Sequence, residues 1–274
     1  MSSNKENLYR FLGDTVVLDA WAIKQDGKNV FDLHADVTFG EDYLGGPEAG
    51  AQVRFRLRIK GARLRLRVPE GEPVRILPQS VVRSTPERRI SQKSVTRVEA
   101  GASGTVEAKA GTKGLGAQFS GGANADFQQE KKMEETESII NIRVWHAGSG
   151  NRHDWNMEPC NDASLKYKPW EDDATRRASA RVDASRDGAS VIFEVRCRAQ
   201  DLVIDEIEIL EDDKKKGRWS PLSRFSRGSK NKETACREYI RQELLRIGLE
   251  AGNIEADDKT WLVLADHVVP LEED

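Results

Sequence analysis

Residues 98–127 read VEAGASGTVEAKAGTKGLGAQFSGGANADF, and they carry the most regular pattern in this 274-residue chain. From Val98 to Ala110 the apolar and small residues occupy the even positions, and from Leu115 to Phe127 they occupy the odd positions. A period of two is the period of a β-strand. The link between the two arms contains Gly111 and Gly114, which is typical of a hairpin turn. The stretch therefore predicts a long amphipathic β-hairpin over residues 94–137.

Each arm of this hairpin is long enough to cross a membrane as a β-strand. Each arm has 13 residues, slightly more than the roughly 9–11 residues with which a tilted strand crosses a bilayer. In a membrane barrel one face of each strand meets lipid and the other meets water, so strict alternation is required. The larger apolar side chains, which we expect to anchor the hairpin in a membrane or in an assembly, are Val98, Val106, Leu115, Phe119 and Phe127.

This pattern resembles the stem hairpins of β-pore-forming proteins, such as the aerolysin-type toxins. In those proteins an amphipathic hairpin rich in Gly, Ser and Thr lies inside a long-stranded β domain, and the resemblance covers residues 94–137. It implies self-assembly followed by membrane insertion. Two other interpretations stay open, because alanine and glycine supply little of the transfer free energy of about 25 cal/mol per Å². One is a soluble hairpin arm that packs on the same chain or on a neighbouring subunit, and the other is a flexible Gly/Ala-rich loop.

The rest of the chain predicts a mainly β fold, either an antiparallel β-sandwich or an elongated twisted sheet, with one helix and a short strand at the C-terminus. The helix is expected over 234–249, where Cys236, Ile240, Leu244 and Ile247 fall on one face and Gly248 or Gly252 ends it. A loop-rich segment is expected over 148–170. The predicted strands cover 15–23, 31–39, 53–59, 62–68, 74–82, 140–145, 191–195, 202–210 and 261–265.

Arginine alternates with apolar residues on both sides of Gly61. The strands around it are predicted to form an antiparallel pair with one core face and one basic face. The candidate anion-binding residues on that face are Arg54, Arg56, Arg58, Arg63, Arg65 and Arg67. Like charges on adjacent strands repel, so we expect something anionic to cover them. The acidic strand that contains Asp205, Glu206 and Glu208 is the favoured cover; a nucleic acid, a lipid headgroup or an acidic protein is the alternative.

Composition and charge indicate the expected domain organisation and location of the protein. The formal net charge is −3, and 32% of the residues are charged. We expect a β domain over 1–213, a basic linker or loop over 214–232 and a helix–strand segment over 233–274. The first seven residues contain no apolar leader and the three cysteines have unrelated spacings, so a cytoplasmic protein without disulfides is expected, with membrane association only after assembly.

The sequence contains no recognisable catalytic constellation, so we expect a non-enzymatic protein with no cofactor and no metal. His146 and His153 flank a Gly/Asn segment and Cys160 follows, but this spacing supplies no short pair of metal ligands, and a surface loop is favoured. The expected partners are further copies of the chain or another protein, with membrane lipid as a further candidate and nucleic acid as a weaker one.

Overall fold

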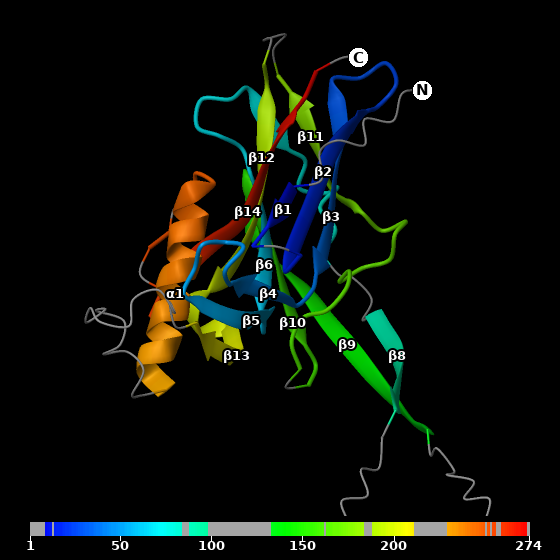
Figure 1. Ribbon diagram of the computed structural model, residues 1–274. Helices are drawn as coiled ribbons and strands as arrows, with labels where there is room; N and C mark the ends of the chain where they lie inside the picture. Colours follow the sequence, from blue (N-terminus) through cyan, green and yellow to red (C-terminus); the bar gives the residue numbers. More distant parts are fainter. Residues whose placement is uncertain are drawn as a thin grey trace, which may run out of the picture. The chain divides into compact units, whose positions relative to one another are not determined.

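A computed structural model describes the chain over residues 9–12, 14–83, 88–97, 133–161, 163–183, 188–210, 229–249, 251–252, 254–255 and 259–272. The fold is mainly β with antiparallel pairing, as predicted, and resembles a β-sandwich (Figure 1). The two arms of the predicted hairpin, with Val98, Val106, Leu115, Phe119 and Phe127, lie outside the described residues.

The first sheet has five strands in the order β1-β2-β3-β11-β7. The predicted hairpin of strands 15–23 and 31–39 is confirmed, because β2 and β3 pair from Val16↔Phe39 to Lys24↔Phe31. Alternate residues of β3 are buried, as expected for a sheet with one face on a core. The bounds are β1 Tyr9–Phe11, β2 Val16–Lys24, β3 Val30–Phe39, β11 Arg176–Val182 and β7 Val74–Ile76.

The second sheet has six strands in the order β14-β12-β6-β10-β9-β8. Its inward side chains and those of the first sheet belong to one hydrophobic cluster, in which Leu18, Leu33, Leu64 and Phe193 are fully buried. The bounds are β14 Trp261–Pro270, β12 Ser190–Arg198, β6 Ala62–Arg67, β10 Arg152–Pro159, β9 Met133–Ser149 and β8 Arg88–Arg97.

The third sheet, in the order β13-β5-β4, continues two strands of the second sheet. β5 leads into β6 through Lys60 and Gly61, and β12 leads into β13 through a short 3-10 turn, η1. β5 pairs with β13 and β6 pairs with β12, so one two-stranded ribbon runs from one sheet into the other. The Lys60 N–H donates to the Asp201 carbonyl across the bend, at 2.8 Å. The bounds are β4 Asp42–Gly45, β5 Val53–Ile59, η1 Ala199–Asp201 and β13 Leu202–Ile209.

The helix α1, Ser229–Arg246, lies beside β5 and β13 of the third sheet (Figure 1). Cys236, Ile240 and Leu244 are fully buried, as the helical spacing predicted, whereas Ile247 lies beyond the helix end and is exposed. The N–H of Gly248 donates to the Leu245 carbonyl and the N–H of Leu249 to the Leu244 carbonyl, which is a Schellman motif. Gly248 has a φ of 83°, the left-handed conformation that this motif requires.

Three sequence predictions are wrong. The strands 53–59 and 62–68 do not pair with each other, because the chain changes sheet at Gly61. The segment 148–170, predicted as loop, contains the whole of β10 in the middle of the six-stranded sheet. The strand predicted over 74–82 ends at Ile76. The polar stretch up to Ser138, left open between strand and helix, is strand from Met133.

The chain divides into two compact units, Met1–Ile90 with Ile140–Asp274 and, as the second, Ser91–Ile139. In the second unit the structure describes only parts of β8 and β9. The linker predicted over 214–232 lies mostly outside the described residues, so the division at that point stays a prediction. Among the described residues, no helix has both the length and the apolar character that a bilayer span needs.

Candidate functional site

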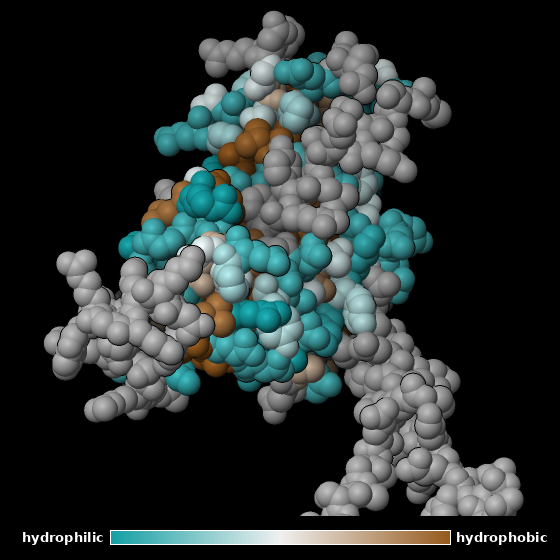
Figure 2. Space-filling view, viewed as in Figure 1, coloured by the Kyte–Doolittle hydropathy of each residue, from teal (hydrophilic) through white to brown (hydrophobic). Residues whose placement is uncertain are grey.

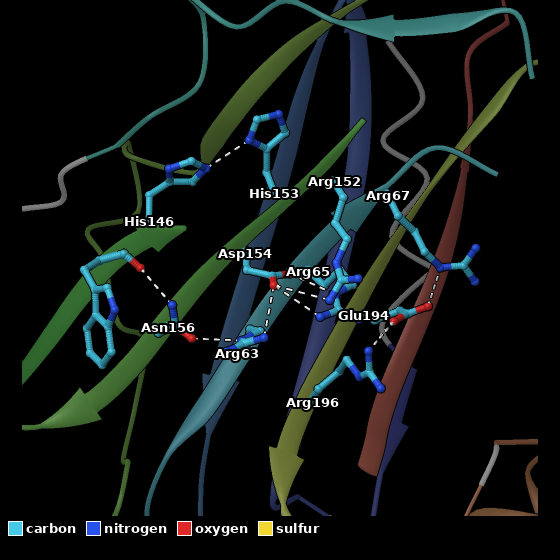
Figure 3. A network of polar contacts seen from close by, with 11 residues as sticks. Arg63, Arg65, Arg67, His146, Arg152, His153, Asp154, Asn156, Glu194 and Arg196 are labelled. Carbon is cyan, nitrogen blue, oxygen red and sulfur yellow. Dashed lines mark hydrogen bonds and ion pairs between the residues drawn. The ribbon is translucent and has the colours of Figure 1, made fainter. Parts of the chain in front are cut away.

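One side of the six-stranded sheet faces the core, and the other side carries mainly arginines and carboxylates (Figure 3). The outward side is built by alternation, since the residues between the outward ones, such as Leu64, Leu66 and Trp155, are buried. We call this outward side the arginine face. Over β6, β10, β12, β14 and residues 142–149 of β9 its charged members are Arg63, Arg65, Arg67, Arg143, Arg152, Asp154, Glu158, Glu194, Arg196, Arg198 and Asp266.

Asp154 of β10 is the main acceptor on this face. Arg65 donates to both of its oxygens, from Nε at 2.8 Å and from Nη2 at 3.2 Å. Arg63 Nη1 donates to Oδ2 at 3.1 Å, and Arg152 Nη2 lies 3.9 Å from the same oxygen. Only 9% of the Asp154 side chain is exposed. One nearly buried carboxylate is therefore shared by three guanidinium groups.

Glu194 of β12 is the second acceptor. Arg67 Nε donates to its Oε1 at 2.6 Å, and Arg196 Nη1 lies 3.9 Å from Oε2. Asn156 of β10 links the network to β9, because its Oδ1 accepts from Arg63 Nε at 2.8 Å and its Nδ2 donates to the Trp145 carbonyl. The neighbouring strands β9, β10, β6 and β12 thus all contribute to these polar contacts (Figure 3).

Two tryptophans stand among these arginines, which the sequence did not indicate. The Arg63 guanidinium lies 3.9 Å from the centroid of the Trp261 ring, and the Arg198 guanidinium lies 5.1 Å from it. Arg143 lies over Trp145 at 5.4 Å. All three are cation–π contacts. The sequence separates Trp261 from Arg63 by nearly 200 residues, so only the sheet order brings them together.

The candidate anion-binding arginines divide between two sheets. Arg56 and Arg58 of β5 pair with Asp205 of β13, and Arg56 also reaches Glu206 at 2.8 Å. This pairing lowers the pKa of Asp205, mainly through the Arg56 hydrogen bond. The predicted cover by the acidic strand is thereby confirmed for these two arginines. Arg54 instead lies over the Tyr43 ring, and Arg63, Arg65 and Arg67 use Asp154 and Glu194, which sequence reasoning had missed.

His146 of β9 and His153 of β10 form a hydrogen-bonded pair, not a surface loop (Figure 3). His153 Nε2 lies 3.0 Å from the Gly150 carbonyl and therefore donates to it, which leaves Nδ1 to accept from His146 Nε2 at 2.9 Å. With Nε2 donating and Nδ1 accepting, the His153 ring is neutral. Burial lowers the pKa of each histidine, and the neighbouring His153 lowers that of His146 further. The described residues contain no cluster of His, Cys, Asp and Glu suited to a metal ion.

β10 could have been found from a signal that the sequence does contain. Its inward residues His153, Trp155 and Met157 alternate with polar residues over Arg152–Pro159. The strand contains no Val, Ile or Thr and begins beside a Gly/Asn turn, so β-propensity favoured a loop. The alternation of residues over this segment predicts the strand correctly, whereas β-propensity does not.

Comparison with known proteins gives matches among solved structures. The NetB toxin of Clostridium perfringens in its membrane-inserted form has 9% identity and a TM-score of 0.28, with 67% of this chain and 78% of that chain covered. The delta-toxin of Clostridium perfringens has 9% identity and the same TM-score, with 67% and 73% covered. A chain described as a pore forming protein has 6% identity and a TM-score of 0.28, with 67% and 80% covered.

No protein-family model and no curated protein matches the chain. At a TM-score of 0.28 the structural similarities define no family for this chain.

Proposed function

We propose that this chain is a non-enzymatic protein that assembles with copies of itself through residues 94–137 and inserts that segment into a membrane as a β-hairpin. The observation that carries the proposal is the alternation of Val98–Ala110 and Leu115–Phe127 in two arms of opposite parity. Such a segment has one face for lipid and one for water only when it is extended.

The strands on either side of this segment support the proposal. β8 ends at Arg97 and β9 begins at Met133, and the two are neighbours in the six-stranded sheet. The intervening residues therefore link two adjacent strands. If a hairpin extended both strands, the pairing between β8 and β9 could continue directly into its two arms.

The position of β8 supports assembly. Among the described strands, β8 is the last in the order β14-β12-β6-β10-β9-β8. The outer edge of such a strand presents N–H and C=O groups that can pair with another chain. In lipid those groups must be satisfied, and a closed ring of hairpins from several copies satisfies all of them.

Dye release from lipid vesicles tests this function. We expect the full chain to release a trapped dye and Phe119→Asp to reduce release on the order of tenfold, because a charge on the lipid face of a barrel strand is costly. The matched control is Gln118→Asp, which puts the same charge on the polar face and should keep release near the unsubstituted level. Equal effects of the two substitutions, or no release by the full chain from any vesicle, would contradict the proposal.

A further inference from the structure

The arginine face carries more positive charge than its carboxylates neutralise. Over β6, β10, β12, β14 and residues 142–149 of β9, where the structure describes the side chains, it has seven arginines, Arg63, Arg65, Arg67, Arg143, Arg152, Arg196 and Arg198, against the four acids Asp154, Glu158, Glu194 and Asp266. The excess concentrates at one place, where Arg63 of β6 is the direct cross-strand partner of Arg196 of β12. Like charges in opposite positions on neighbouring strands destabilise a sheet.

Arg198 adds a third charge at the same place. Its guanidinium lies over the Trp261 ring that Arg63 also contacts, at 5.1 Å and 3.9 Å from the centroid. Among the described residues the Arg198 guanidinium has no carboxylate within ion-pair distance. The positive charges of Arg65, Arg198 and Arg152 lower the pKa of Arg63, after burial, which is the largest cause.

Arg196 is incompletely satisfied. Its only ion pair among the described residues is with Glu194 at 3.9 Å, and Glu194 already accepts from Arg67 at 2.6 Å. Its Nε is buried and has no hydrogen-bond partner in the described part of the chain. Only 19% of the side chain is exposed, as for Arg63. A buried donor without a partner costs free energy, so the cluster lacks an acceptor.

We propose that Arg63 and Arg198, which both lie over Trp261, bind a phosphate group together with Arg196, the cross-strand partner of Arg63. Three guanidinium groups offer many N–H donors and three positive charges in one half-buried place (Figure 3 shows Arg63 and Arg196 on neighbouring strands). A phosphate group carries up to two negative charges and several acceptor oxygens, and arginine binds it in a bidentate manner. A carboxylate would satisfy fewer of these donors. This site is independent of the proposed membrane hairpin.

Thermal unfolding of the full chain in inorganic phosphate tests the site, with sodium chloride at the same ionic strength as reference. We expect phosphate to raise Tm with a saturable dependence on concentration. The double substitution Arg196→Gln with Arg198→Gln should weaken the apparent affinity for phosphate about tenfold or more. Loss of one hydrogen bond between charged groups is enough to change an affinity by about tenfold. In sodium chloride the Tm of the same variant should be at least as high as that of the unsubstituted chain, because the variant loses the repulsion between Arg63 and Arg196.

Arg143→Gln is the matched control, because Arg143 lies on the same face over its own tryptophan and opposite Glu158 rather than another arginine. It should keep the phosphate effect. If the double variant does not fold, Arg198→Gln alone replaces it, since Arg198 makes no ion pair in the described residues. The site is refuted if phosphate stabilises no more than chloride, or if Arg143→Gln and the cluster variant lose the effect equally.

A second arm distinguishes the source of the phosphate group. Vesicles of phosphatidylcholine with and without phosphatidic acid are mixed with the unsubstituted chain and with Arg198→Gln. Binding to phosphatidic acid that Arg198→Gln abolishes supports the site and assigns it to a lipid headgroup. A response to inorganic phosphate without such vesicle binding also supports the site and assigns it to a small soluble ligand.

Discussion

At the scale of single residues, burial decides which ion pairs stabilise the protein. Asp154 and Asp205 each accept from more than one arginine, but the Asp154 side chain is 9% exposed and that of Asp205 is 31% exposed. Exposed pairs contribute little because water and salt screen them. Removing one partner of a buried pair leaves uncompensated charge, which is strongly destabilising.

Asp154→Asn should therefore lower the free energy of unfolding by about 3 kcal/mol. Asp205→Asn, at the more exposed cluster of Arg56 and Arg58, should lower it by at most about 1 kcal/mol. Urea unfolding followed by circular dichroism measures both variants under the same conditions. Similar losses for the two would show that burial does not control these clusters.

Acidification should destabilise the protein in the range where histidine titrates. Burial, as the largest cause, lowers the pKa of all four histidines, His34, His146, His153 and His267. The unfolded chain then binds protons at higher pH than the folded chain. The resulting stability is full above the unfolded pKa of about 6.5 and is lost as the pH falls through the folded values.

We expect a lower free energy of unfolding at about pH 6 than at about pH 7.5, at constant ionic strength. Replacing both members of the histidine pair, by His146→Gln with His153→Gln, should reduce this difference. Greater stability at the lower pH would contradict the lowered pKa values of these buried histidines.

At the scale of elements, the bent ribbon of β5–β6 and β12–β13 determines where the arginines lie. The alternation of Arg54, Arg56 and Arg58 was correctly assigned to a strand, and so was that of Arg63, Arg65 and Arg67. Their partners were not predictable from the alternation alone. A glycine between two alternating strands is compatible both with a hairpin and with a bend into another sheet.

Disulfide formation distinguishes the bend from a hairpin. In a Cys160→Ser background, Arg58→Cys with Val203→Cys should cross-link on oxidation, because residues 58 and 203 are directly paired and adjacent strand positions satisfy disulfide geometry. Arg58→Cys with Arg63→Cys should not cross-link, although a hairpin about Gly61 would pair those positions. Mass spectrometry of the oxidised, unreduced protein reads both outcomes, and cross-linking of the second pair alone would refute the bend.

Local periodicity predicted β2, β3, β12, β13 and α1, since each has a clear apolar repeat of its own. It did not predict which strands are neighbours. The candidate site depends on those neighbours, because Asp154, Glu194 and Trp261 come from three strands far apart in the sequence. The arginines of the site were therefore predicted, and their acidic and aromatic partners were not.

At the scale of the whole molecule, the described residues form a β scaffold whose surface is mainly hydrophilic where Figure 2 colours it. Its buried apolar residues form one cluster across the sheets. Residues 98–127 are by contrast rich in glycine and alanine and contain few large apolar side chains. A segment of that kind gains little from packing in a core, so we infer that its function lies in assembly.

The proposed function requires that residues 94–137 become an extended hairpin with one face in lipid. The most direct test places an environment-sensitive fluorophore on single cysteines at successive positions from Leu115 to Phe127, in a Cys160→Ser background, and compares emission with and without vesicles. We expect a blue shift with a period of two, strong at odd positions such as Phe119 and weak at even ones such as Gln118. A uniform shift, a helical period or no shift at any position would contradict it.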